Sequence, residues 1–143
     1  MTTIFRRSLV GLAAVATLAA APAFAEMQTY KATLNGASQV PPVTTKGTGA
    51  LTATYDTATK KLTWSVTYAD LSGPPTAAHF HGPAAAGANA GVAIPQKDGL
   101  ASPMKGEATL TDAQAADLTA GRWYFNIHTD ANKGGEIRGQ VVK

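Results

Sequence analysis

The chain has 143 residues, no cysteine, three histidines and a formal net charge of +3 at pH 7. Without cysteine, disulfides and thiolate metal sites are excluded, so hydrophobic burial must hold the fold. Any metal ligand must then be a nitrogen, an oxygen or a thioether. Two of the twelve basic residues, Arg6 and Arg7, precede an apolar segment, and the rest of the chain is nearly neutral. A near-neutral domain without a basic cluster is not a nucleic-acid binder.

The first 25 residues have the layout of a secretory signal peptide. Arg6 and Arg7 form a positive segment, Leu9–Ala21 is apolar and rich in alanine, and Ala23-Phe24-Ala25 is a small-residue cleavage signal. The apolar run is too short to span a membrane. We therefore expect a signal peptide over residues 1–25 and one domain over residues 26–143. We expect that domain to be periplasmic or secreted and to have no membrane association after cleavage. The paired arginines leave both the Sec and the twin-arginine export routes open.

Alternation of apolar and polar side chains with period two predicts antiparallel strands along most of the remaining chain. The clearest strand runs from Leu62 to Tyr68, where Leu, Trp, Val and Tyr alternate with Thr and Ser. Similar patterns occur at residues 30–34, 51–55, 78–81, 108–110, 123–127 and 137–141. Short strands separated by Gly, Pro and Asn predict an all-β fold, an antiparallel β-sandwich or Greek-key barrel.

Two segments depart from this pattern. Thr111–Leu118 offers a helix N-cap followed by alanine-rich helix formers, and Gly121 follows it, so one short helix is expected there. Residues 83–101 are rich in Gly, Ala and Pro, which predicts a long loop around a short strand at Val92–Ile94. Long loops in compact domains are often functional.

All three histidines fall in two strand-like segments. His79 and His81 share one strand face because side chains alternate, and Phe80 between them is the natural core residue. On the other segment, Phe125 and Ile127 share one face and Asn126 and His128 the other. Imidazole is the commonest protein ligand for transition metals. If the two strands are neighbours, His79, His81 and His128 predict a three-nitrogen metal site.

Imidazole ligands suit copper and zinc, and the affinity order of divalent ions favours copper. Met104 could add a thioether ligand, although a single methionine is more often core filler. Asp130 and Asn126 could supply an oxygen ligand or accept an imidazole N–H. Glu136 and Arg138 share a strand face, where an ion pair at a sheet edge is expected; the alternative is that Glu136 supports the histidine face.

Four short motifs then match a known family. They are Gly-Ala-Ser-Gln-Val-Pro-Pro-Val at 36–43, Ala-His-Phe-His-Gly-Pro-Ala at 78–84, Tyr-Phe-Asn-Ile-His-Thr at 124–129 and Gly-Glu-Ile-Arg-Gly-Gln at 135–140. In this order they resemble the CHRD domain, named after chordin. The resemblance covers residues 30–142 and implies an exported β-rich domain, which in bacteria often stands alone after a signal peptide. It does not imply a reaction.

A weaker similarity is to copper–zinc superoxide dismutases, which also place a His-x-His pair on a β-sandwich strand. Here His79 and His81 resemble that pair, and His128 resembles the late copper ligand. Those enzymes also need a bridging histidine and further zinc ligands, and residues 83–103 contain no histidine. We therefore expect no dismutase activity, and the sequence predicts no enzyme.

Two functions compete at this point. The first is an exported protein that captures, buffers or delivers copper through its histidines, with a protein partner for metal transfer. The second is a module that binds protein or carbohydrate, in which the histidines are structural and Val40–Val43 forms a contact loop.

The cleavage signal gives the first testable prediction. The exported protein should begin at Glu26, because signal peptidases cut after small residues spaced as Ala23 and Ala25 are. Intact-mass spectrometry of the exported protein measures this directly. A soluble exported form that keeps residues 1–25 would contradict it.

Overall fold

Strands make up most of residues 25–143, the part of the chain that the computed structural model describes. The strands are β1 (Met27–Asn35), β2 (Thr48–Asp56), β3 (Lys61–Ala69), β4 (Pro75–His81), β5 (Val92–Pro95), β6 (Met104–Thr109), β7 (Trp123–Thr129) and β8 (Ile137–Val141). A short 3-10 turn, η1 (Gly36–Ser38), and one helix, α1 (Asp112–Thr119), complete the elements of this part. The expected signal peptide lies almost entirely outside the described residues.

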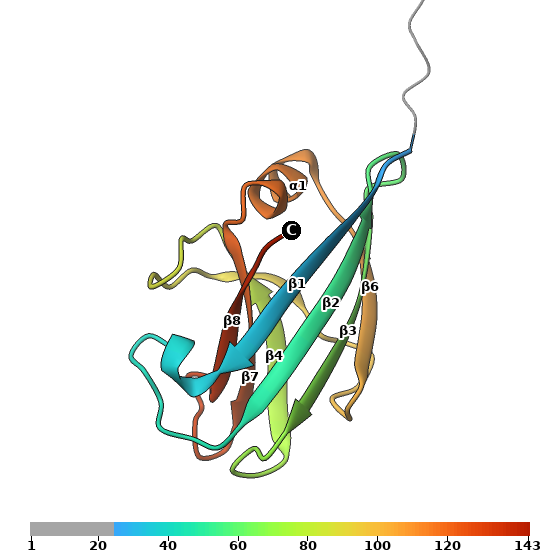
Figure 1. Cartoon of the computed structure of the whole chain (residues 1–143). Coiled ribbons are helices and arrows are strands. Elements are labelled where there is room, and N and C mark those ends of the chain that lie inside the picture. Colours follow the sequence, from blue (N-terminus) through green and yellow to red (C-terminus); the bar gives the residue numbers. More distant parts are fainter. Residues whose placement is uncertain (1–24) are drawn as a thin grey trace, which may run out of the picture.

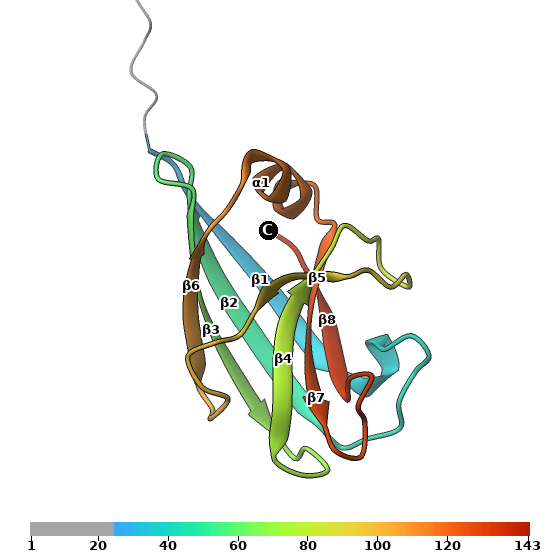
Figure 2. The ribbon, with the colours of Figure 1, turned by 180° about the vertical axis from the view of Figure 1, so that it is seen from behind.

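The eight strands form one antiparallel sheet in the order β5-β4-β7-β8-β1-β2-β3-β6. Figures 1 and 2 show that this sheet curls, so that β4, β7 and β8 face β1, β2 and β3 across the interior. Strands β1 and β8 pair only at Asn35 with Arg138 and through a bridge between Lys31 and Val142. The sheet therefore behaves as two four-stranded walls joined at one corner, and the expected all-β sandwich or barrel is confirmed.

The opposite corner is closed by one side chain instead of a strand pair. Gln96, just after β5, accepts a hydrogen bond from Trp64 Nε1 at 2.7 Å. Its own Nε2 donates to the carbonyl oxygen of Lys105 on β6 at 2.8 Å. A buried indole N–H needs such an acceptor. Gln96 thus links the two end strands of the sheet.

The core fills the space between the two walls. Phe80 on β4 lies at its centre, with its ring centroid 5.0 Å from Trp64 on β3, 5.6 Å from Trp123 and 4.9 Å from Phe125 on β7. These rings meet edge to face or at a tilt, which aromatic pairs prefer. Other fully buried core residues include Tyr30, Leu34, Leu51, Leu62, Val66, Ile127 and Ile137.

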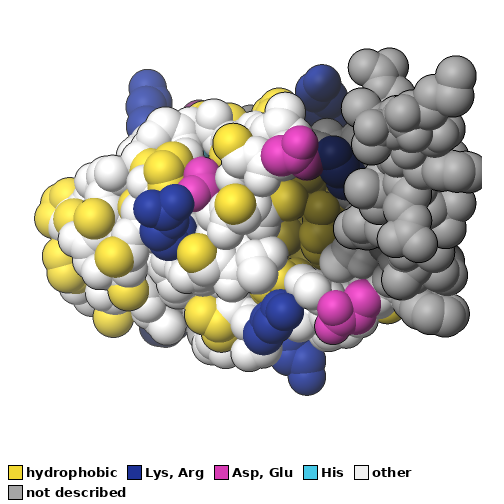
Figure 3. All heavy atoms as spheres, turned by 90° about the horizontal axis from the view of Figure 1, so that it is seen from above, with side chains coloured by type: hydrophobic (Ala, Val, Ile, Leu, Met, Phe, Trp, Pro, Cys, Tyr) yellow, Lys and Arg dark blue, Asp and Glu magenta, His cyan; other side chains and the backbone are white. Residues whose placement is uncertain are grey.

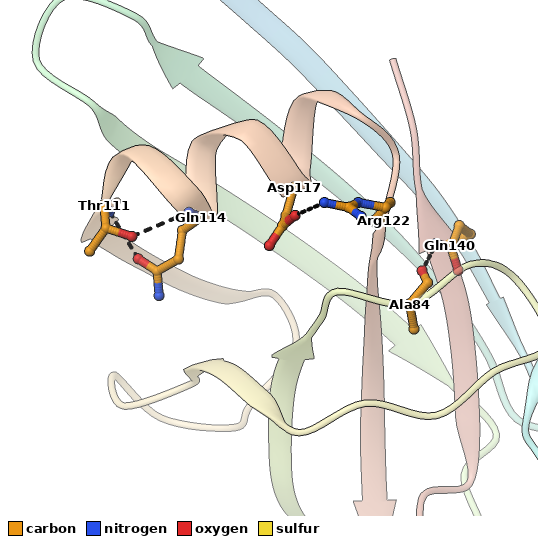
Figure 4. A network of polar contacts seen from close by, with 6 residues as sticks. All are labelled: Ala84, Thr111, Gln114, Asp117, Arg122 and Gln140. Atoms are coloured by element: carbon orange, nitrogen blue, oxygen red, sulfur yellow. Dashed lines mark hydrogen bonds and ion pairs between the residues drawn. The ribbon is translucent and has the colours of Figure 1, made fainter.

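Helix α1 covers one end of the barrel (Figures 1 and 2). Thr111 is its N-cap, and the Thr111 and Gln114 side chains each accept the other residue's backbone N–H, as Figure 4 shows. Leu118 is its fully buried residue. An Asp117–Arg122 ion pair follows at its C-terminal end. The helix predicted over Thr111–Leu118 is confirmed.

The surface at this end of the barrel is chemically mixed. Figure 3 shows basic, acidic and apolar side chains interspersed there, and no histidine is seen among the described residues on this face. Over residues 25–143, no helix has the length and apolar character needed to cross a membrane.

The central position of Phe80 gives a stability prediction. Phe80→Ala should lower the free energy of unfolding by about 3–5 kcal/mol, because it removes a buried ring and leaves a cavity between the walls. Urea unfolding followed by tryptophan fluorescence measures the loss. Val92→Ala, at a residue that is 53% exposed, is the matched control and should change little. Equal losses for the two variants would contradict the central role of Phe80.

Candidate metal centre

The core dictates which way the histidines point. Phe80 on β4 packs inward, so His79 and His81 on either side of it point outward. On β7, Phe125 and Ile127 pack inward, so Asn126 and His128 point outward. The two strands are adjacent, as the sequence analysis required.

The register of β4 and β7 brings the outward side chains together. His79 pairs with Asn126, and Ala77 with His128, so the third histidine lies diagonally opposite the first. His79 Nδ1 lies 3.1 Å from His128 Nε2. One ring nitrogen from each of His79, His81 and His128 falls within 4.8 Å of the others. Ligand nitrogens of a tetrahedral ion with bonds of about 2.0–2.1 Å are about 3.3 Å apart, so small side-chain rotations suffice.

Asn126 adds an oxygen to this cluster. Its Oδ1 lies 3.0 Å from His81 Nε2 and 3.0 Å from His128 Nε2. Three nitrogens and one amide oxygen therefore converge on one region of the outer face. Oxygen and imidazole nitrogen together are a donor set that divalent transition metals accept.

Backbone carbonyls fix the tautomers of two rings. His81 Nδ1 lies 3.0 Å from the carbonyl oxygen of Ala90, and His128 Nδ1 lies 2.8 Å from that of Lys133. A carbonyl oxygen only accepts, so both Nδ1 atoms carry the hydrogen. In the neutral rings the Nε2 lone pairs then point at Asn126. This is the arrangement in which a metal-ligating histidine donates its other N–H to a carbonyl.

The surroundings favour neutral imidazoles. Burial lowers the pKa of His79, and the neighbouring His128 and His81 lower it further. Burial also lowers the pKa of His81, although hydrogen bonds to Ala90 and Asn126 act in the opposite direction. Both rings are therefore neutral at pH 7, the form that ligates a metal.

A second layer covers part of the cluster. The Tyr124 ring stacks parallel on the His81 ring, with 4.8 Å between centroids. The Arg138 guanidinium lies 3.4 Å above the centroid of Tyr124. The long loop after β4 folds over this stack, and the Tyr124 hydroxyl donates to the carbonyl oxygen of Ala90. His81 is thereby buried, while His79 and His128 stay partly exposed.

Two of the expected additional ligands are not part of this cluster. Met104 is the first residue of β6 and packs in the core, on the inner side of the barrel wall. Asp130 follows β7 and is exposed, and it does not belong to the group of candidate ligands. The strand that carries Met104 belongs to the opposite wall, so its side chain fills the core and cannot reach the histidines.

The expected ion pair between Glu136 and Arg138 at a sheet edge is wrong. Strand β8 lies inside the sheet, between β7 and β1. Glu136 precedes it and is fully buried. Its carboxylate accepts hydrogen bonds from Thr45, Ser72 and Thr129, at 2.6–2.8 Å. Through Thr129, Glu136 fixes the end of the strand that carries His128.

No prediction from the sequence connected the carbonyls of Ala90 and Lys133, or the side chains of Tyr124 and Arg138, with the histidine cluster. Backbone carbonyls carry no sequence signal. Tyr124 does share its strand face with Asn126 and His128, so alternation alone could have placed it beside the histidines.

The comparisons with known proteins agree with the motifs. The family model for the CHRD domain matches residues 30–141, most of the chain. No curated protein and no solved structure matches the chain.

The hydrogen bonds to Glu136 generate a prediction about acid stability. Burial raises the pKa of Glu136, but hydrogen bonds from Ser72, Thr45 and Thr129 outweigh it and lower the pKa to about 2. A lowered pKa stabilises the fold above about pH 4.5, and that contribution is lost as the pH falls toward about 2. Its magnitude is about 3 kcal/mol.

Glu136→Gln should therefore destabilise the protein at pH 7, and the difference from the parent should shrink between pH 4.5 and pH 2. Urea unfolding at about pH 7, 4 and 3 measures this difference in unfolding free energy above and below the usual pKa of a carboxyl group. Glu107→Gln, at a largely exposed carboxylate, is the control. A difference from the parent that stays constant with pH would contradict the prediction.

Proposed function

The chain belongs to the CHRD domain family, and we propose that this member is an exported protein that binds one copper ion through His79, His81 and His128. The observation that carries the proposal is the convergence of these three ring nitrogens with Asn126 Oδ1 on the outer face of β4 and β7. In the neutral rings, the lone pairs of these atoms are available to one cation.

The donor set supports copper over other ions. Three imidazole nitrogens and an amide oxygen are N and O ligands of the kind that Cu²⁺ takes, and copper stands highest in the affinity order of divalent ions. Zinc accepts the same ligands and is the alternative. The core position of Met104 leaves the cluster without a thioether, which does not favour Cu⁺.

The partial exposure of two ligands supports a carrier role over catalysis. His79 and His128 are reachable from solvent while His81 is buried, so a ligand from a partner protein could approach the ion from one side. We propose capture, buffering or delivery of copper in the periplasm or outside the cell, with a protein partner for transfer and no enzymatic reaction.

Competitive copper titration of the purified protein tests the site. Replacement of any of His79, His81 or His128 by alanine should weaken binding more than about 100-fold, because loss of a supporting residue alone costs about 10–100-fold. Asn126→Ala should fall within that smaller range. Asp130→Ala and Met104→Leu are the controls and should bind as the parent does.

The same titration at about pH 7.5, 6 and 4.5 measures how protons compete with copper for the imidazole nitrogens. Because the pKa values of His79 and His81 are lowered, affinity should hold until the pH falls below the usual histidine range near 6.5 and then decline. If His128→Ala binds as tightly as the parent, only a local His-x-His chelate remains. If none of the histidines matters, the copper proposal fails and a binding module with structural histidines takes its place.

A further inference from the structure

A buried cation lies on the outer face next to the histidine cluster. Arg138 on β8 is only 2% exposed. Its Nη1 donates to Asn89 Oδ1 at 2.8 Å, and its Nη2 donates to the carbonyl oxygen of Ala88 at 2.5 Å. Tyr124 covers one face of the guanidinium. These partners are neutral, so they orient the charge without compensating it.

No carboxylate of residues 25–143 lies within ion-pair distance of Arg138. An uncompensated buried charge is costly, which is why buried arginines usually pair with an anion. The nearest acid along the chain, Glu136, accepts all its hydrogen bonds from Thr45, Ser72 and Thr129 instead. The protein therefore holds a preformed cation with unused capacity for an anion.

Arg138 lines a cavity of about 340 Å³ between the η1 loop and the loop after β4. Its other walls include the apolar residues Ala37, Val40, Pro42 and Ala86. No acidic residue of the described chain lines it. A small cavity with apolar walls and one cation suits a small molecule that has an apolar body and one negative group.

A second buried polar group lines the same cavity. Gln39 is only 6% exposed, and its Nε2 finds no hydrogen-bond partner among the described residues. Gln39 Nε2 and Asn126 Nδ2 lie 2.4 and 2.8 Å from the point where a Cβ on Gly135 would be. Buried amide N–H groups without a partner are rare in proteins.

We propose that this cavity is a binding site for a small organic carboxylate, with Arg138 as its counter-charge. The guanidinium is already oriented by Asn89 and Ala88, and its planar fork matches a carboxylate. The apolar body of the acid would lie against Val40, Pro42 and Ala86. None of the three histidines lines this cavity, so binding of the carboxylate needs no metal on the histidine cluster.

The test is a calorimetric or NMR titration of the exported, chelator-treated protein with benzoate as the probe. Removal of the metal prevents the carboxylate from reporting on the copper site. Benzoate should bind saturably, and the neutral isostere benzamide should bind about 10–100-fold more weakly, because hydrogen bonds to charged groups are the stronger ones. Sodium chloride at matched ionic strength serves as the reference.

Variants locate the site. Arg138→Gln should abolish the preference for benzoate over benzamide. Ala86→Trp, at an exposed wall residue, should block both probes, and it keeps the test valid if Arg138→Gln does not fold. Ala85→Trp, at the exposed neighbouring residue outside the cavity wall, is the matched control and should bind as the parent does. Equal binding of benzoate and benzamide, no saturable binding, or no effect of Ala86→Trp would overturn the proposal.

Discussion

The inward packing of Phe80 is the constraint on which the rest of the arrangement depends. Its ring contacts Trp64 of the facing wall and Trp123 and Phe125 of its own wall, so β4 cannot turn over without emptying the centre of the core. Because side chains alternate along a strand, this one choice sends His79 and His81 outward together. The same rule applied to Phe125 and Ile127 sends Asn126 and His128 to that face. The inward packing of the apolar side chains on β4 and β7 thus gathers the polar side chains of both strands on the outer face.

The outer face of a barrel wall is ordinarily exposed to solvent, but here the loop after β4 covers part of it. It starts at Gly82, where a Cβ would lie 2.3 Å from the Trp123 ring, so only glycine lets the chain pass this close to the wall. The loop then returns over β7 and β8, where Ala84 accepts from Gln140 (Figure 4), Ala88 from Arg138 and Ala90 from Tyr124. Its carbonyls supply acceptors to buried donors, and one of them sets the tautomer of His81.

Alternation and glycine, proline and capping signals were enough to predict the strands, the single helix and the shared face of the histidines. Those features depend on residues close together in the sequence, so the residue types themselves indicate them. The sequence could not show that β8 lies inside the sheet, because pairing partners are set by the whole topology. For that reason Glu136 and Arg138, two positions apart, were expected to pair, whereas each is engaged by loops distant in the sequence. Met104 packs in the core, the role that is more common for a single methionine, and the wall that buries it could not be inferred from the sequence.

The stack of His81, Tyr124 and Arg138 joins the two polar regions of this face. The Tyr124 ring has an imidazole on one side and a guanidinium on the other, and the negative faces of an aromatic ring attract positive charge on both sides. A metal ion on His81 would make that imidazole more electropositive and strengthen its contact with the ring. An anion beside Arg138 would in turn offset the positive charge gathered on the far side. The proposed copper site and the proposed carboxylate site would therefore lie on opposite faces of one aromatic ring.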